Sequence, residues 1–117
     1  MITRANGIIR ISAEELRALL DAHQEVMIID IRPPEAFFSS PLTILGAICI
    51  APEEIGQRYA RLPRHRRVVV VGEGPPDRAT LSAARFLASH GFRRVAILEG
   101  GFTRWEALEY PTEPRPG

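Results

Sequence analysis

The chain contains no lysine, one cysteine and one asparagine among its 117 residues. Without lysine there is no Schiff-base chemistry and no Walker-type phosphate loop. The single cysteine, Cys49, excludes an internal disulfide and any zinc site built on paired thiolates. All fifteen basic residues are arginine, and they face eleven Glu and three Asp, so the net charge is +1. A charge so close to zero gives no overall attraction to nucleic acid or to an anionic membrane, and we expect neither partner.

Long hydrophobic runs are also missing. No apolar stretch approaches the roughly 20 residues of a membrane span, and residues 1–12 lack the apolar core of a signal peptide. We therefore expect a cytoplasmic protein. The length suits one compact domain, since such domains most often have about 100–150 residues. We expect one domain over residues 7–110 and a flexible, proline-rich tail over residues 111–117.

Apolar strands and amphipathic helices alternate along the chain. Strand-like segments cover residues 7–11, 26–31, 47–50, 68–71 and 95–98, and helical patterns cover 13–22, 53–62, 80–90 and 102–108. Ser12 and Glu15 have the spacing of a capping box, and Gly91 is placed as a helix C-cap. This alternation predicts an α/β domain, with a parallel sheet of about five strands and helices on both faces.

In such sheets the chemistry gathers where strands end and loops meet helix N-termini. Two segments lie at such places. The first is the pair Asp30 and Arg32, after the second strand. The second is the loop that follows the run of four valines, with the sequence Gly72, Glu73, Gly74, Pro75, Pro76, Asp77, Arg78, Ala79, Thr80.

Four segments together resemble the rhodanese family: IIDIRPPEAF at 28–37, GAICIAPEE at 46–54, the strand, loop and helix at 68–90, and GFRRVAILEGGFTRW at 91–105. The resemblance spans roughly residues 9–111. It implies sulfur transfer through a persulfide on a cysteine that directly follows a strand, in a loop whose N–H groups hold an anion. This chain has Gly72 at that position, so the resemblance implies that the nucleophile is missing.

The same loop departs from the family in further ways. Pro75 and Pro76 supply no N–H group, and Glu73 and Asp77 add negative charge. Five residues separate Gly72 from Arg78, which is the spacing of rhodanese-related phosphatases. Arg78 could bind phosphate or sulfate, or it could pair with Glu73, Asp77 or a helix end.

Other candidate residues have a functional and a structural interpretation. Asp30 and Arg32 match a D-x-R element of the family: Arg32 would frame the site, or Asp30 would cap N–H groups and pair with Arg32. Cys49 is either a buried small hydrophobe or a displaced nucleophile. His23, His65 and His90 show no ligand spacing, so we expect no metal and no cofactor.

An arginine-rich stretch at residues 58–67 is the candidate docking surface for a protein partner, through Arg58, Arg61, Arg64, Arg66 and Arg67. Its structural interpretation is a solvated helix end balanced by acidic residues. A homodimer could bury the adjacent Phe37 and Phe38, but the sequence leaves the oligomeric state open.

The residues favour a rhodanese-like module that binds or regulates and has no sulfurtransferase activity. Two alternatives stay open. One is a working thiosulfate or persulfide sulfurtransferase, or a sulfur carrier, that uses Cys49 or a partner's thiol. The other is a module that senses phosphate or sulfate through Arg78.

Overall fold

The computed structural model describes residues 3–5, 8–38 and 40–116. Its main sheet has the strand order β1-β2-β7-β6-β3-β5. Five strands are parallel, as predicted: β2 (Ile8–Ile11), β3 (Val26–Asp30), β5 (Ile48–Cys49), β6 (Arg67–Val71) and β7 (Val95–Leu98). The sequence pattern missed the short strand β1 (Thr3–Ala5), which pairs antiparallel with β2 at the edge.

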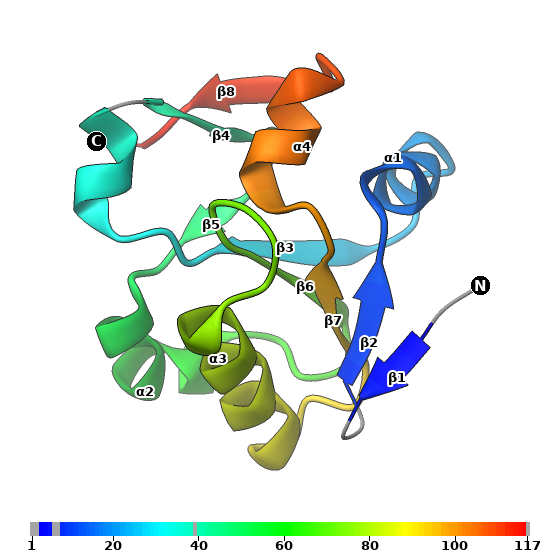
Figure 1. The fold of residues 1–117 in the computed structure, drawn as a ribbon. Coiled ribbons are helices and arrows are strands. Elements are labelled where there is room, and N and C mark those ends of the chain that lie inside the picture. The colour runs from blue at the N-terminus through cyan, green and yellow to red at the C-terminus, as the bar shows by residue number, and fades with distance from the viewer. Residues whose placement is uncertain (1–2, 6–7, 39, 117) are drawn as a thin grey trace.

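Helices cover both faces of this sheet (Figure 1). On one face α1 (Ala13–Asp21) and α4 (Gly101–Ala107) pack against a core cluster that includes Val69, Val71 and the fully buried Trp105. On the other face α2 (Ile55–Arg58) and α3 (Arg78–Ser89) pack against Val68, Val70 and their neighbours. The successive valines of β6 thus face opposite layers, as in a strand that is buried on both sides. The predicted fold class is confirmed.

Several predicted boundaries differ from the structure. The helix expected at 53–62 is instead three short pieces: the 3-10 turn η2 (Pro52–Glu54), α2 and a second turn η3 (Tyr59–Arg61). Gly56 lowers the helix propensity of this segment, and Leu62, which precedes a proline, is extended. Helix α3 begins at Arg78 rather than at residue 80 because Asp77 caps it. The 3-10 helix η1 (Pro34–Phe38) lies between β3 and β4.

The segment after Pro111, expected to be flexible, contains a strand. Strand β8 (Thr112–Pro114) pairs antiparallel with β4 (Leu42–Ile44) and forms a second, two-stranded sheet. The indole Nε1 of Trp105 donates to the carbonyl of Pro111 at 2.8 Å, which holds the start of this segment against α4. The pairing partner is some seventy positions earlier in the chain, and composition alone does not reveal it. Gly7 and Gly117, the ends of the two predicted segments, lie outside the described residues.

The helix ends follow the predicted signals. The Ser12 hydroxyl accepts from the Glu15 N–H, and the Glu15 carboxylate accepts from the Ser12 N–H, both at 3.0 Å. These hydrogen bonds lower the pKa of Glu15. His90 is the C-cap of α3, and Gly91 follows it with a φ of +98°. None of the helices in the described ranges is long and apolar enough to cross a membrane.

Gly101, the first residue of α4, has no room for a side chain. Its φ is +61°, and a Cβ atom there would lie 2.3 Å from the carbonyl oxygen of Gly74. We predict that Gly101→Ala lowers the free energy of unfolding by about 2 kcal/mol or more, because overpacking adds to backbone strain. Gly56→Ala is the matched control, since that position is open and helical, and it should stabilise the fold by about 0.5 kcal/mol. Urea titration of both variants measures the difference, and equal effects would contradict the prediction.

Candidate functional site

The loop of residues 72–77 connects β6 to α3 and lies against the start of α4 (Figure 1). The carbonyl of Gly72 accepts from the Phe102 N–H at 2.8 Å. The carbonyl of Glu73 accepts from the N–H and the hydroxyl of Thr103, at 2.8 and 2.7 Å. The loop therefore directs carbonyl oxygens at the N-terminus of α4. The N–H groups of Phe102 and Thr103 are used within the chain instead of facing an anion.

The N-terminus of α3 is occupied in a similar way. Asp77 is its N-cap, and one carboxylate oxygen accepts from the N–H of Thr80 at 2.9 Å and from its hydroxyl at 2.8 Å. These hydrogen bonds lower the pKa of Asp77, and the one from the Thr80 backbone N–H has the larger effect. A helix N-terminus attracts negative charge. Here the chain supplies that charge itself, with a carboxylate that remains ionised at neutral pH.

Gly72 sits directly after β6 and is buried. Its φ lies outside the left-handed region, so the backbone would accept a side chain. A side chain there would require the Thr80 hydroxyl to shift. A Cβ atom at residue 72 would lie 2.5 Å from the hydroxyl oxygen of Thr80, well inside van der Waals contact. Thr80 itself is only 2% exposed, so the hydroxyl is enclosed at this point.

Beside the loop lies a buried ion pair. Arg32 donates through Nε and Nη2 to the two carboxylate oxygens of Asp30, at 3.1 and 2.8 Å, and its backbone N–H donates to Asp30 Oδ1 at 3.0 Å. Both side chains are fully buried. Asp30 thus caps a neighbouring N–H group and pairs with Arg32, as the structural interpretation of this motif predicted.

This pair connects four parts of the fold. The Thr43 hydroxyl in β4 donates to Asp30 Oδ2 at 2.7 Å, and Arg32 Nη2 donates to the carbonyl of Leu42 at 2.5 Å. The guanidinium lies over the ring of Phe102 in α4, with its central carbon 4.0 Å from the ring centroid. Its Nη1 is 3.8 Å from a carboxylate oxygen of Glu73 in the loop. Arg32 is therefore held between β3, β4, α4 and the loop.

Arg78 lies at the solvent-facing start of α3. Among the described residues, no ion pair includes Arg78, and its two expected acidic partners are engaged elsewhere. Glu73 faces Arg32, and Asp77 caps the helix. The expected pairing of Arg78 with Glu73 or Asp77 is therefore not what the structure has.

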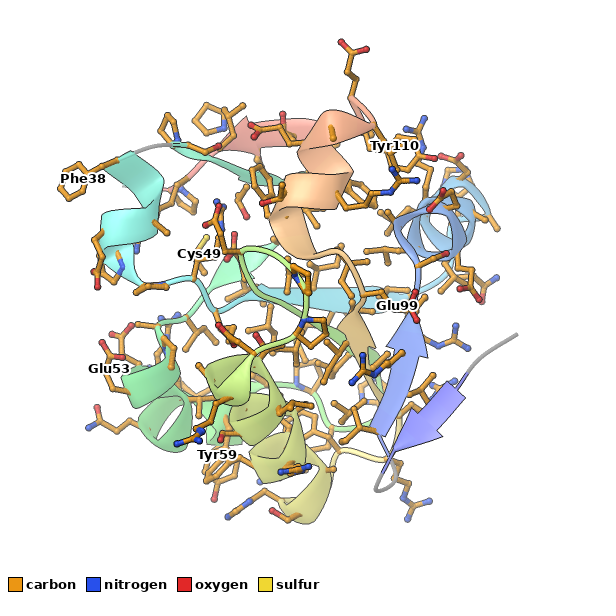
Figure 2. The ribbon with its side chains drawn as sticks, viewed as in Figure 1. Phe38, Cys49, Glu53, Tyr59, Glu99 and Tyr110 are labelled. Atoms are coloured by element: carbon orange, nitrogen blue, oxygen red, sulfur yellow. The ribbon has the colours of Figure 1, made fainter. Side chains whose placement is uncertain are left out.

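Cys49, labelled in Figure 2, is the last residue of β5, and β3 lies between β5 and the strand β6 that precedes the loop. Asp30 lies in register between Cys49 on β5 and Val71 on β6, and neighbouring strands are about 4.8 Å apart. Partial burial raises the pKa of the Cys49 thiol, and the charge of Asp30 raises it further, against hydrogen bonds with Thr43 and Arg115. The thiol is therefore protonated at neutral pH, and a protonated thiol is a poor nucleophile.

Sequence reasoning found Asp30, Arg32 and the loop, which the structure brings together. It missed Thr43, Phe102 and the carbonyl of Leu42, which complete the surroundings of the ion pair. The sequence signal for Thr43 was a threonine between two apolar residues, in the segment LTI. Across the described ranges, no three His, Cys, Asp or Glu side chains gather as a metal-binding group.

The charge on Asp77 provides a pH test of this geometry. Its folded pKa is lowered, so its contribution is present above the unfolded pKa of about 3.9 and is lost as the pH falls through the folded value. We predict that Asp77→Ala lowers the free energy of unfolding by about 1 kcal/mol at pH 7, and by less at pH 3. Asp77→Asn, which keeps a capping oxygen, should be near neutral at both pH values. Chemical denaturation measures this, and an equal loss for Asp77→Ala at both pH values would contradict it.

Comparison with known proteins identifies a family that shares this fold. Residues 12–108, most of the chain, match the family described as Rhodanese-like domain. No curated protein matches the chain. Among solved structures, a full-length protein from Lactobacillus plantarum superposes with a TM-score of 0.81 at 22% identity, with 91% of this chain and 88% of that chain covered.

Two further structures agree in fold. The Alr3790 protein from Anabaena sp. has a TM-score of 0.76 at 29% identity, over 89% of this chain and 80% of that chain. A rhodanese-related protein from Thermoplasma volcanium has a TM-score of 0.72 at 24% identity, over 89% and 96%. The family match and the shared fold agree with the order of motifs along the sequence. This chain belongs to the Rhodanese-like domain family of the sulfurtransferase superfamily.

Proposed function

We propose that this rhodanese-like domain is a binding or regulatory module without sulfurtransferase activity. The observation that carries the proposal is the Thr80 hydroxyl, which lies 2.5 Å from the point where a side chain on Gly72 would begin. A glycine offers no atom that could carry a persulfide. The space that such a side chain would need is occupied by the Thr80 side chain, in the first turn of α3.

The electrostatics of the loop support the same proposal. An anionic substrate such as thiosulfate is attracted by free N–H groups and by positive charge. Here the carboxylate of Asp77 takes the N-terminus of α3, and the N–H groups at the start of α4 donate to loop carbonyls. Glu73 adds a second negative charge, which Arg32 faces from the protein interior. An incoming anion would have to displace ligands that the chain already provides.

The wild-type protein tests the proposal directly. With thiosulfate and cyanide as substrates, we expect thiocyanate to form no faster than in a protein-free blank. Mass spectrometry after thiosulfate treatment should show no added sulfur on Cys49, because its thiolate is scarce at neutral pH. Turnover that a Cys49→Ser variant abolishes would overturn the proposal in favour of a sulfurtransferase, and an added sulfur without turnover would overturn it in favour of a sulfur carrier.

A restored nucleophile tests the loop itself. In a Cys49→Ser background, Gly72→Cys should give a thiol whose pKa is at or above the ordinary value of about 8.5, because Asp77 and Glu73 oppose a thiolate. Gly72→Cys combined with Thr80→Ala provides the missing space and is the matched control for crowding. The pH dependence of the reaction with a thiol reagent measures both pKa values. If the combined variant has a pKa more than one unit below 8.5, the loop still works as an anion cradle and only the nucleophile has been lost.

A further inference from the structure

The charges are distributed unevenly along the chain. The segments 55–72 and 78–98 contain nine arginines and no Asp or Glu, whereas the rest of the chain has six arginines against all fourteen acids. The formal charges are therefore +9 and −8, although the whole carries only +1. The positive segments form α2, β6, α3 and β7, which include the helix layer on one face of the sheet (Figure 1).

The positive charge is densest where β6 and β7 begin. These strands are parallel neighbours, so the turns that precede them lie side by side at the amino ends of the strands. One turn supplies Arg64 and His65, and the other supplies Gly91, Arg93 and Arg94. These five residues line an open hollow of about 550 Å³. Arg58, which is close to Arg64 in the sequence, does not line the hollow. Its side chain donates to the carbonyl of Cys49 in β5.

Two arginines of the hollow are held in place by backbone carbonyls. Arg64 donates through Nε to the carbonyl of His90 at 3.0 Å, and Arg94 donates through Nη2 to the carbonyl of His65 at 3.1 Å. Within the described part of the chain, neither these two nor Arg93 has a carboxylate in ion-pair range. Their charges are therefore positioned and not neutralised. Side chains that are already ordered lose less entropy when they bind.

We propose that this hollow is a docking surface for an acidic segment of a partner protein, rich in Asp and Glu. Arginine presents a planar set of donors that matches a carboxylate in bidentate geometry. The surface lies at the amino ends of β6 and β7, whereas the loop of residues 72–77 follows the carboxyl end of β6. The inference therefore does not depend on whether that loop is catalytic.

The surroundings of the hollow favour a peptide over a nucleic acid. Single-stranded nucleic acids bind to aromatic rings whose faces are open for base stacking. Here Phe92 is only 2% exposed, and the rings of Tyr59, Phe86 and His90 pack on one another. Exposed Glu25 precedes β3, whose Val26 pairs in register with Arg67, and it limits the positive surface on that side. A long polyanion would run beyond the arginines, whereas a short acidic segment would not.

Fluorescence anisotropy with a short labelled peptide of alternating Glu and Gly, at low ionic strength, tests this proposal. We expect binding that Arg93→Glu weakens at least fivefold, which corresponds to about 1 kcal/mol. Arg85→Glu is the matched control, because Arg85 is exposed on α3 outside the hollow and the change in net charge is the same. The control should change the affinity less than twofold, and equal weakening by both variants would overturn the proposal.

Titration of the wild-type protein by NMR keeps the test independent of any variant. The largest amide shifts should fall on residues 64–67 and 91–94. An oligo-dT of the same formal charge is the competing probe, and tighter binding of the oligo-dT would assign the surface to nucleic acid instead. Shifts spread over the whole positive layer, or no binding of the peptide, would also reject the docking surface.

Discussion

The buried ion pair of Asp30 and Arg32 is the interaction on which the rest of the site depends. Removing two charges from water costs several kcal/mol per ion, and the cost is recovered only where the geometry and the hydrogen bonds are good. Here the pair has bidentate geometry, a backbone N–H, the Thr43 hydroxyl, the carbonyl of Leu42 and the ring of Phe102. Each of these contacts fixes a different segment relative to β3. These contacts also fix the loop, because the loop carbonyls accept hydrogen bonds from α4, the helix that contains Phe102.

The loop itself is satisfied from within. In an anion cradle the backbone N–H groups point at a vacant centre and wait for a ligand. In this chain the acceptors are the carbonyls of Gly72 and Glu73 and the carboxylate of Asp77, and N–H and hydroxyl groups at the starts of α3 and α4 donate to them. The result is a rigid connection between β6, α3 and α4. These hydrogen bonds stabilise the fold that the chain shares with its family. Gly101 is essential to this arrangement because only a glycine fits against the loop backbone.

Local patterns predicted the parts of the fold that depend on local physics. Four valines in β6, the capping box at Ser12 and the glycine that ends α3 at residue 91 were each predictable because neighbouring residues determine them. The pairing of β4 with β8 was not, since it joins segments far apart in the chain and has little hydrophobic alternation. In the site, Asp30 and Arg32 were found from their motif, whereas the role of Thr80 was not. Its hydroxyl matters through a distance to Gly72 that only the folded loop defines.

The concentration of positive charge in residues 55–72 and 78–98 makes the charge that the molecule presents depend on ionic strength. The molecule is 24 Å across its shortest dimension. At 0.01 M salt the screening length is about 30 Å, so an approaching body senses nearly all the charges together, as one nearly neutral particle. At 0.15 M the screening length is about 8 Å, so a body at the hollow of Arg64, Arg93 and Arg94 senses mainly these nearby arginines. The charge that this protein presents to an encounter is therefore set by the salt around it and by the side from which it is met.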